Sequence, residues 1–441
     1  MVDRWRALGI INRGGTWNQC GEAINADIPP TFQWNTSSLR PTISRHRFQI
    51  DMRAARYYAA GDIRIEDVPT PELSTGDNKV LVEVDWCGIC GSDLMEYLVG
   101  PFTIPSARTG PHPLTNTILP VTMGHEFTGR ITHLPDSVGK ERCIGAQGTP
   151  LKAGQAVVID PRYYCSSCLP CSQSATNCCE KFGFVGLSGG GGGLSEFVAV
   201  SASQVYVLPE SEASSEAGGV DLAAAALIEP LAVGWHAVQL FLSTHPSPPN
   251  LSTVPVLVIG ADPVGVATIF VLRAFGVKTI LVSEPSRVKR EMVQQTGITT
   301  EIHDPTEVNI PDRCKKVTGD GVGVVFDCAG SQPGFEAGCE SLRFRGVYVN
   351  ISVPKNPMTL PLGPFIKKEI TFKCSLSYND KDFGDTVDAF VAGQFSGVEK
   401  MITKRLALED IVEDGFEELI KPNDHIKMLA TPKDANLSRE T

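Results

Sequence analysis

A run of closely spaced cysteines constrains this chain more than any other feature. Its sequence is C-S-S-C-L-P-C-S-Q-S-A-T-N-C-C, in which gaps of two, two and seven residues separate Cys165, Cys168, Cys171 and Cys179. Two-residue gaps turn successive thiolates toward one ion, and the longer arm closes a tetrahedron, so the spacing is typical of a structural zinc lobe. The competing interpretation is disulfides or unrelated free thiols. The spacing favours Cys179 over the adjacent Cys178 as the fourth ligand.

Length and composition exclude several classes of protein. A chain of 441 residues predicts two domains with room for an appendage. The balance of 39 basic and 50 acidic residues gives a net charge of −11 without a basic stripe, so no nucleic-acid partner is expected. No apolar run is long enough to span a membrane. The 13 cysteines, densest at metal spacing, favour a reducing compartment over a secreted disulfide framework.

Residues 1–51 differ in composition from the rest of the chain, with six Arg and no Lys. They contain no apolar core of a secretory signal. We interpret them as an N-terminal extension and weigh three origins: a start codon assigned too early, a transit peptide rich in Arg and Ser/Thr, and a segment that packs on the body. The cytoplasm is the expected compartment, or the mitochondrion if the transit-peptide interpretation holds.

A second group of metal-ligand residue types lies before the cysteine run. The segment W-C-G-I-C-G-S-D-L-M-E-Y contains Cys90, Ser92 and Asp93, and the segment P-V-T-M-G-H-E-F-T-G contains His125 and Glu126. Each segment alone is a weak signal, because a single histidine is more often structural. Together they supply the thiol, imidazole and carboxylate of an open zinc site.

Glu229 is the only acidic residue in the apolar helical stretch 223–238, and Pro230 follows it directly. An isolated carboxylate in such a stretch is costly unless a partner binds it. The competing interpretation is a glutamate at the end of a helix that faces water. We therefore expect Glu229 to have a partner in the folded protein.

Residues 254–352 have the pattern of a dinucleotide-binding unit. A buried strand, a glycine-containing turn, a helix and a second strand ending in Glu284 follow one another as in a Rossmann fold. The candidate cofactor-binding residues are Gly260, Asp262, Pro263, Val264, Gly265 and Glu284. Asp262 replaces the middle glycine of the turn, which adds bulk and negative charge near the pyrophosphate and predicts weakened binding.

The identity of the cofactor depends on Glu284. Its carboxylate should accept the two ribose hydroxyls and repel a 2′-phosphate, so NAD is favoured over NADP. Arg287, Lys289 and Arg290 follow and offer an alternative phosphate site. A solvated helix face is the simpler interpretation of these three residues.

These motifs resemble the zinc-dependent medium-chain alcohol dehydrogenases, especially the butanediol, polyol and threonine dehydrogenase branch. The resemblance covers about residues 52–432. It implies an α/β fold in which a GroES-like, β-rich catalytic domain is joined to a Rossmann domain. The implied segments are a catalytic domain at 52–232 with a zinc lobe at 161–181, a Rossmann domain at 233–374 and a return to the catalytic domain at 375–441.

The resemblance also assigns roles to individual residues. It implies that Cys90, His125 and Glu229 bind a catalytic zinc ion, with Glu126 as a further ligand or a neighbour of the ligands. It implies that Ser92 hydrogen-bonds the substrate oxygen and starts a proton relay. Four cysteines would hold a structural zinc ion: Cys165, Cys168, Cys171 and Cys179. The outer base of the relay in this family is commonly a histidine five residues after the zinc cysteine.

This chain has Met95 at that position, and a thioether cannot carry a proton. The first hypothesis for the function is an NAD-dependent zinc alcohol dehydrogenase for small secondary alcohols, with vicinal diols such as 2,3-butanediol favoured. A polyol or L-threonine dehydrogenase is the alternative within the same class. A catalytically weak zinc- and dinucleotide-binding protein is the alternative of another class, because of Asp262 and Met95. We expect a homodimer or homotetramer.

Overall fold

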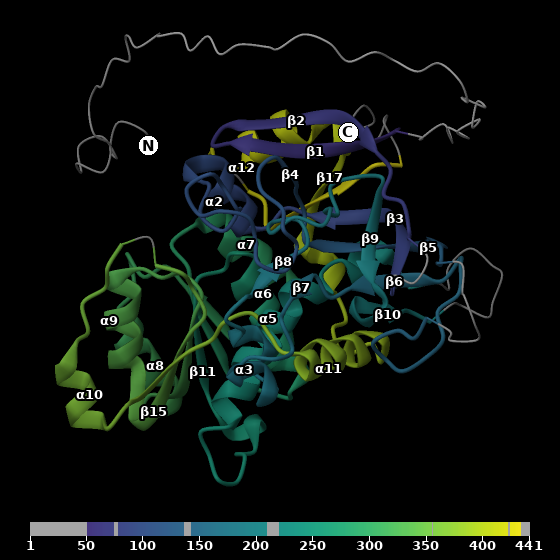
Figure 1. Ribbon diagram of the computed structural model, residues 1–441. Coiled ribbons are helices and arrows are strands. Elements are labelled where there is room, and N and C mark those ends of the chain that lie inside the picture. Colours follow the sequence, from purple (N-terminus) through teal and green to yellow (C-terminus); the bar gives the residue numbers. More distant parts are fainter. Residues whose placement is uncertain are drawn as a thin grey trace, which may run out of the picture. The chain divides into compact units, whose positions relative to one another are not determined.

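The computed structural model describes residues 51–74, 78–135, 143–209, 220–354, 356–421 and 424–433. All described residues belong to one compact unit, Gln49–Thr441 (Figure 1). The predicted N-terminal extension therefore lies outside the described residues, apart from Asp51. Among the helices that are described, none combines the length and the apolar character that crossing a membrane requires.

The first part of the described chain consists mainly of strands, as its alternating Val- and Ile-rich segments predict. One sheet has the strand order β2-β1-β4, and a larger one has the order β10-β6-β5-β3-β18-β17 with β9 also paired to β3. β7 and β8 pair antiparallel in a separate two-stranded sheet. The strands are β1 (Asp51–Ala59), β2 (Asp62–Pro69), β3 (Lys79–Gly88), β4 (Val121–Thr122), β5 (Glu126–His133), β6 (Ala156–Ile159), β7 (Arg162–Tyr163), β8 (Gly183–Phe184), β9 (Phe197–Ser201), β10 (Val205–Val207), β17 (Ile402–Ala407) and β18 (Lys427–Thr431).

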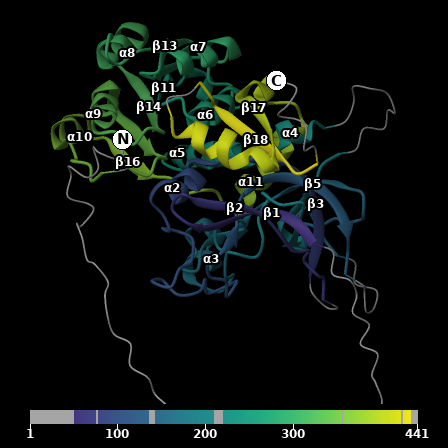
Figure 2. The same cartoon turned by 90° about the horizontal axis from the view of Figure 1, so that it is seen from above.

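The last strands of the chain belong to this larger sheet, beside the strands of the first part (Figure 2). β18 pairs antiparallel with β3, so that Leu429 lies opposite Gly88 and Ala430 opposite Cys87. This pairing brings the start of β18 to the end of β3, where the segment with Cys90 begins. Residues more than 300 positions apart therefore meet at one end of the sheet.

The remaining strands form a six-stranded parallel sheet of order β13-β12-β11-β14-β15-β16. On β11, Val256 and Val258 pack with α5 and α6, whereas Leu257 and Ile259 pack with α8 and α9. Side chains alternate between the faces of a strand, so the sheet is covered on both sides, as Figure 1 shows. The strands are β11 (Val256–Ile259), β12 (Ile280–Ser283), β13 (Glu301–His303), β14 (Val322–Asp327), β15 (Leu342–Asn350) and β16 (Thr371–Cys374).

The helices lie between these strands along the chain, and α5, α6, α8 and α9 cover the parallel sheet. Their bounds are α2 (Gly91–Val99), α3 (Leu169–Ser172), α4 (Leu222–Ala225), α5 (Ile228–Leu242), α6 (Pro263–Ala274), α7 (Arg287–Thr296), α8 (Ile310–Thr318), α9 (Gln332–Ser341), α10 (Leu362–Lys368), α11 (Asp380–Val391) and α12 (Glu417–Leu419). The helical stretch predicted at 223–238 is thus two helices, α4 and α5. The second begins just before Pro230, which has no N–H to donate and is tolerated only in a first turn.

The turn between β11 and α6 depends on two of the predicted glycines. Gly260 has a φ of +92°, a conformation that side chains rarely adopt. At Gly265, a Cβ would lie 2.2 Å from the carbonyl oxygen of Gly260. The helix therefore approaches the strand end as closely as a Rossmann turn requires, and a side chain at Gly265 would push the two apart.

We predict that Gly265→Ala destabilises the protein, because the added methyl group meets backbone rather than a movable side chain. Overpacking of this kind costs about 1–3 kcal/mol. The matched control is Gly363→Ala in α10, where a Cβ meets nothing within 4 Å. Thermal unfolding should show a lower midpoint for Gly265→Ala and an unchanged or slightly higher one for the control. Equal midpoints in the two variants would contradict this account of the turn.

Candidate functional site

The structure brings together Cys90, His125 and Glu126, whose ligand atoms all lie within 4.8 Å of one another. Strand pairing explains how. Glu126 is the first residue of β5 and lies opposite Gly88, at the end of β3, while Cys90 directly precedes α2. A Cβ on Gly88 would lie 2.1 Å from Glu126 Oε2, so glycine is what allows this carboxylate to occupy the strand end. Thiol, imidazole and carboxylate are donors that suit an open zinc site.

Two residues of α2 complete the surroundings of His125. Asp93 is fully buried, accepts a hydrogen bond from the backbone N–H of Cys90 at 3.0 Å, and has its Oδ1 3.4 Å from His125 Nδ1. A carboxylate beside one imidazole nitrogen orients the ring and directs the other nitrogen toward a metal. That other nitrogen, Nε2, lies 3.2 Å from the hydroxyl oxygen of Ser92. The predicted relay serine therefore lies at the edge of the candidate metal site.

Lys427 is a residue of this site that sequence reasoning did not identify. It is 1% exposed, and its Nζ lies 2.7 Å from both carboxylate oxygens of Glu126 and 3.2 Å from the carbonyl oxygen of Ile89. Burial lowers the pKa of Lys427, but the charges of Glu126, Cys90 and Glu229 and the hydrogen bond to Glu126 together outweigh that effect and raise it, so the ammonium stays charged. A lysine within the apolar run of β18 was the available signal, because such a position is rarely filled by a charge without a partner.

Glu229 does not belong to the group of ligand atoms that lie within 4.8 Å. It is 5% exposed, in the first turn of α5, and its Oε1 accepts a hydrogen bond of 2.8 Å from the hydroxyl of Tyr378. Burial raises the pKa of Glu229 to about 7, and the charges of His125 and Glu126 also act on it. Glu229 therefore lies beside the group of ligand atoms. Two carboxylates are then candidates for the third ligand: Glu126, which Lys427 holds, and Glu229.

The four predicted cysteines form the second group of ligand atoms within 4.8 Å. Cys168 Sγ lies 3.8 Å from Cys179 Sγ, and backbone N–H groups donate to the sulfurs: Cys165 N to Cys179 Sγ at 3.2 Å, and Cys168 N to Cys165 Sγ at 3.3 Å. Such bonds favour thiolates, the form that binds zinc. Cys171 belongs to the same group, whereas Cys178 is exposed and does not. Every described cysteine is a free thiol, so the disulfide interpretation finds no support.

Glu284 lies beside the glycine turn of the parallel sheet, buried with 6% exposure. Its two carboxylate oxygens accept backbone hydrogen bonds of 2.8 Å from Ala261 and Ser286. Pro263 and Val264 are the first two residues of α6. Asp262, whose side chain is 57% exposed, forms an ion pair with Lys289. The negative charge that the sequence places in the turn is therefore offset.

The basic residues that offered a 2′-phosphate site have partners in the structure. Lys289 pairs with Asp262, and Arg290 lies 2.8 Å from Asp304 while donating to the carbonyl oxygens of Glu284 and Pro285. Arg287 forms an exposed pair with Glu291 one helical turn away. A 2′-phosphate would have to displace these contacts.

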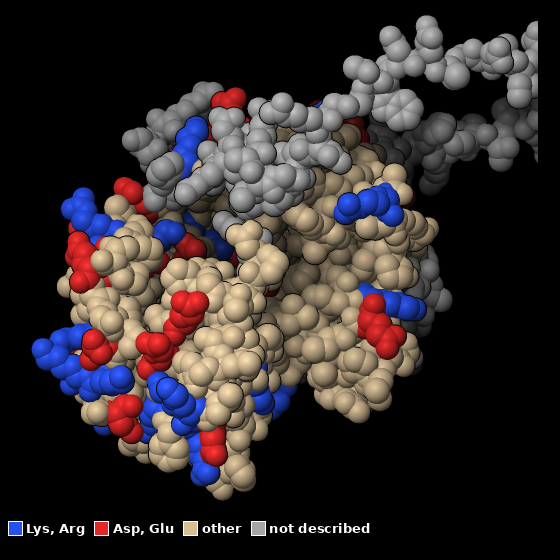
Figure 3. Space-filling view, turned by 90° about the vertical axis from the view of Figure 1, so that its left-hand side faces the viewer, with Lys and Arg blue, Asp and Glu red and all other residues tan. Residues whose placement is uncertain are grey.

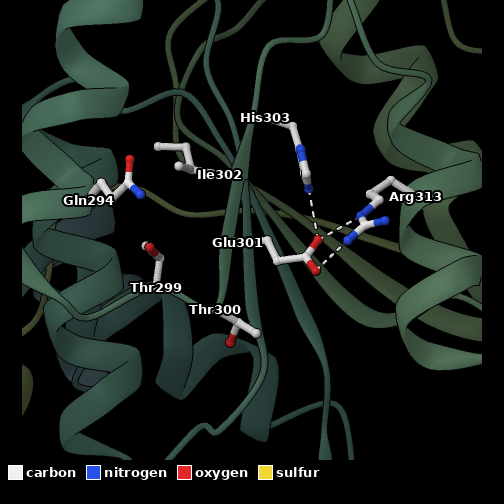
Figure 4. Close-up of a pocket in the computed structure, with 7 residues that line it drawn as sticks. All are labelled: Gln294, Thr299, Thr300, Glu301, Ile302, His303 and Arg313. Atoms are coloured by element: carbon white, nitrogen blue, oxygen red, sulfur yellow. Dashed lines mark hydrogen bonds and ion pairs between the residues drawn. The ribbon is translucent and has the colours of Figure 1, made fainter.

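A cavity of about 450 Å³ at the edge strand β13 contains none of the predicted site residues. Figure 4 shows Glu301 between Arg313 and His303, which bind it at 2.5–2.8 Å. The hydrogen bond from Arg313 contributes most to lowering the pKa of Glu301 to about 2. The charges in this cavity therefore satisfy one another. On the face in Figure 3, basic and acidic side chains are interspersed rather than separated by sign.

Comparisons with known proteins agree with this architecture. A family model described as "Alcohol dehydrogenase GroES-like domain" matches residues 76–210, and one described as "Zinc-binding dehydrogenase" matches residues 263–392. The (R,R)-butanediol dehydrogenase of Neisseria gonorrhoeae is 34% identical over 384 residues, with 86% of this chain and 99% of the relative covered. That of Bacillus subtilis is 35% identical over 382 residues, with 86% and 100% covered.

Among solved structures, the crystal structure of 2R,3R-butanediol dehydrogenase from Bacillus subtilis matches with a TM-score of 0.73 at 34% identity, covering 87% of this chain and 100% of that one. The predicted fold class, a GroES-like domain joined to a Rossmann domain, is confirmed. The chain belongs to the zinc-dependent medium-chain alcohol dehydrogenase family.

Proposed function

We propose that this protein is an NAD-dependent zinc dehydrogenase that interconverts small secondary alcohols and ketones, with vicinal diols such as 2,3-butanediol favoured. The observation that carries the proposal is the group of Cys90, His125 and Glu126 with Ser92 at its edge. The relatives named butanediol dehydrogenases, which match nearly over their whole length, support the choice of substrate class.

The chain's own residues would bind and orient the reactants. A zinc ion held by Cys90, His125 and one of the two glutamates would supply Lewis-acid polarisation of the alcohol oxygen. Ser92 is placed to accept the proton of the substrate hydroxyl group in a hydrogen bond and to pass it outward. Met95 follows Ser92 by three residues on α2, hence on the same side of the helix, and offers no group to receive that proton.

NAD is the proposed hydride acceptor. Glu284 follows β12 and accepts a hydrogen bond from Ala261 in the glycine turn, which supports a role in accepting ribose hydroxyls; its charge would oppose a 2′-phosphate. The engagement of Lys289 by Asp262 and of Arg290 by Asp304 supports the same choice. Hydride would pass from the carbinol carbon to the nicotinamide ring.

Absorbance of reduced nicotinamide tests the function directly. Purified protein with NAD should oxidise 2,3-butanediol faster than sorbitol, xylitol or L-threonine at equal concentrations. Faster oxidation of a polyol or of threonine would move the protein to the alternative within its class. Binding of zinc and NAD without turnover of any substrate would identify it as the catalytically weak binding protein.

Metal content provides the second test. We predict two zinc ions per chain, one at each ligand group. Cys168→Ser should lose one zinc and destabilise the fold, because a structural zinc site contributes folding free energy. The matched control is Cys178→Ser, which changes an exposed neighbouring cysteine outside the group and should keep both. His125→Ala should lose the other zinc and abolish turnover while the fold persists. Elemental analysis that finds one zinc in fully loaded wild-type protein would refute the assignment.

The cofactor preference depends on one carboxylate. Glu284→Ala should weaken NAD binding more than NADP binding, since the lost group both accepts hydroxyls and repels phosphate. Glu291→Ala is the control, because this exposed glutamate lies on the following helix, α7, and pairs only with Arg287. Titration calorimetry with both cofactors measures the ratio of affinities. A wild-type preference for NADP would show the proposal to be wrong.

Met95→His should raise turnover near neutral pH if proton release limits the rate, because imidazole titrates near neutrality and a positioned base contributes about 10²–10⁴-fold. The gain should shrink at high pH, where hydroxide can accept the proton, and vanish in a Ser92→Ala background. A pH profile of kcat measures both effects. An unchanged profile would mean that another base serves Ser92 or that hydride transfer or NADH release limits the rate.

We also propose a homodimer that forms along β16. This strand is the last in the parallel sheet, so one of its edges has no partner strand within the described chain. Exposed apolar side chains surround it: Phe344, Leu362, Ile366 and Phe372. An exposed strand edge beside apolar side chains favours pairing with a second copy across a two-fold axis, which would continue the sheet.

Ile366→Glu combined with Phe372→Glu should therefore convert a dimer to monomers. The control is Leu169→Glu, which adds a charge at an apolar residue of the cysteine lobe that is 68% exposed, close to the 74% of Ile366. Sedimentation velocity gives the masses. A monomeric wild-type protein, or a double variant that stays dimeric, would contradict this interface; a tetrameric wild type that the double variant reduces to dimers would show that β16 forms one of two interfaces.

A further inference from the structure

Tyr378 links the candidate catalytic carboxylate to a second buried network. Its side chain is 0% exposed, and its hydroxyl donates to Glu229 Oε1 at 2.8 Å. Its carbonyl oxygen accepts a hydrogen bond of 2.6 Å from Arg162 Nη1, and the Arg162 guanidinium lies over its ring, 4.8 Å from the centroid. Both the ring and the backbone of Tyr378 are therefore held by one arginine, while its hydroxyl holds Glu229.

Arg162 belongs to β7, three residues before the first cysteine of the lobe, and is itself fully buried. Asp160 binds it through two hydrogen bonds of 2.9 and 2.5 Å, and Asp380 accepts another of 2.6 Å. Its Nη1 also donates to the hydroxyl of Thr176 at 3.0 Å. Thr176 lies three residues before Cys179, so both ends of the cysteine lobe are tied to the same guanidinium group.

A continuous chain of contacts thus runs from the cysteine lobe through Thr176, Arg162 and Tyr378 to Glu229. We propose that Tyr378 is a positioning residue that fixes the Glu229 carboxylate beside the catalytic metal, and that Arg162 makes this position depend on the folded cysteine lobe. The proposal rests on the two zinc sites of the proposed function. It adds that the structural site influences the catalytic one through side chains, without sharing a ligand with it.

The physical basis is the rigidity of the parts. An arginine fork bound to carboxylates and stacked on an aromatic ring has little freedom, because planar, charge-assisted hydrogen bonds fix its orientation. A tyrosine hydroxyl has only one torsion to adjust. Loss of the contact with Thr176 would let the guanidinium group of Arg162 move. The carbonyl group and ring of Tyr378, which that guanidinium holds, would then also be less restrained.

The first experiment compares Tyr378→Phe with Tyr206→Phe. Tyr206 is a buried tyrosine that packs on Phe383, as Tyr378 does, but its hydroxyl lies 3.4 Å from the carbonyl oxygen of Asp380 rather than on Glu229. Competition with a chelator measures the metal affinity of each site. The binding step of the catalytic site is the one that is absent from the titration of His125→Ala. Mutation of a residue that hydrogen-bonds a metal ligand typically lowers metal affinity or activity about 10–100-fold.

We expect Tyr378→Phe to weaken binding at that site about 10-fold and to alter the visible spectrum of cobalt placed there, with the cysteine site still loaded. Tyr206→Phe should match the wild type in both measurements. Wild-type affinity and an unaltered spectrum in folded Tyr378→Phe would overturn its positioning role. These measurements need no turnover, so a wild type that binds metal but oxidises no alcohol would refute the proposed function alone.

The second experiment tests the connection to the lobe without touching a cysteine. Thr176→Val removes the hydroxyl that binds Arg162, and Ser172→Ala is the control, an exposed lobe residue whose hydroxyl donates to the carbonyl oxygen of Leu169. Thr176→Val should alter the cobalt spectrum in the same direction as Tyr378→Phe, and Ser172→Ala should leave it unaltered. If Thr176→Val keeps the wild-type spectrum, the dependence on the lobe is wrong. This variant also decides the proposal if Tyr378→Phe does not fold.

Discussion

The buried ion pair between Lys427 and Glu126 is the interaction on which the candidate site depends. Both side chains are 1% exposed, and the ammonium contacts both carboxylate oxygens. Removing one member of such a pair leaves an uncompensated buried charge and costs about 3–5 kcal/mol. The pair joins β18 to the start of β5, where His125 and Glu126 lie, and its ammonium also contacts the carbonyl oxygen of Ile89, next to Cys90. The candidate metal ligands are thus held in place partly by β18, the strand that pairs with β3 in the larger sheet.

Two departures from the family pattern have different consequences in the structure. Asp262 adds a charge to the glycine turn, but Lys289 from α7 pairs with it, so the expected repulsion of the pyrophosphate is smaller than the sequence alone predicts. Because Lys289 is bound to Asp262, it is not available to bind a phosphate group of the cofactor. Met95 itself supplies no titratable atom in place of the imidazole, because a thioether cannot carry a proton. The first departure therefore concerns cofactor choice, and the second concerns the rate of proton release.

Features that depend on the spacing of residues close together in the chain could be predicted from the sequence. Four cysteines within fifteen residues, or a glycine turn between a strand and a helix, form with little help from the rest of the chain, so the cysteine group and the turn at Gly260 and Gly265 could be predicted. Contacts between distant positions could not. Lys427 meets Glu126 across 301 positions, and Tyr378 meets Glu229 across 149. Strand order and helix packing create both contacts, and no local pattern contains that information.

The pairing of β18 with β3 sets an order in which the protein can mature on the ribosome. The strands of the parallel sheet follow one another along the chain, so that domain can complete itself while synthesis continues, as domains generally fold in units. The cysteine lobe is also contiguous and can capture zinc early. The site at Cys90 cannot, since the lysine that balances Glu126 lies 301 positions after it in the chain. A nascent chain thus carries the Glu126 carboxylate without its counter-charge until β18 has been made, so the candidate metal site becomes competent after the parallel sheet and the cysteine lobe are complete.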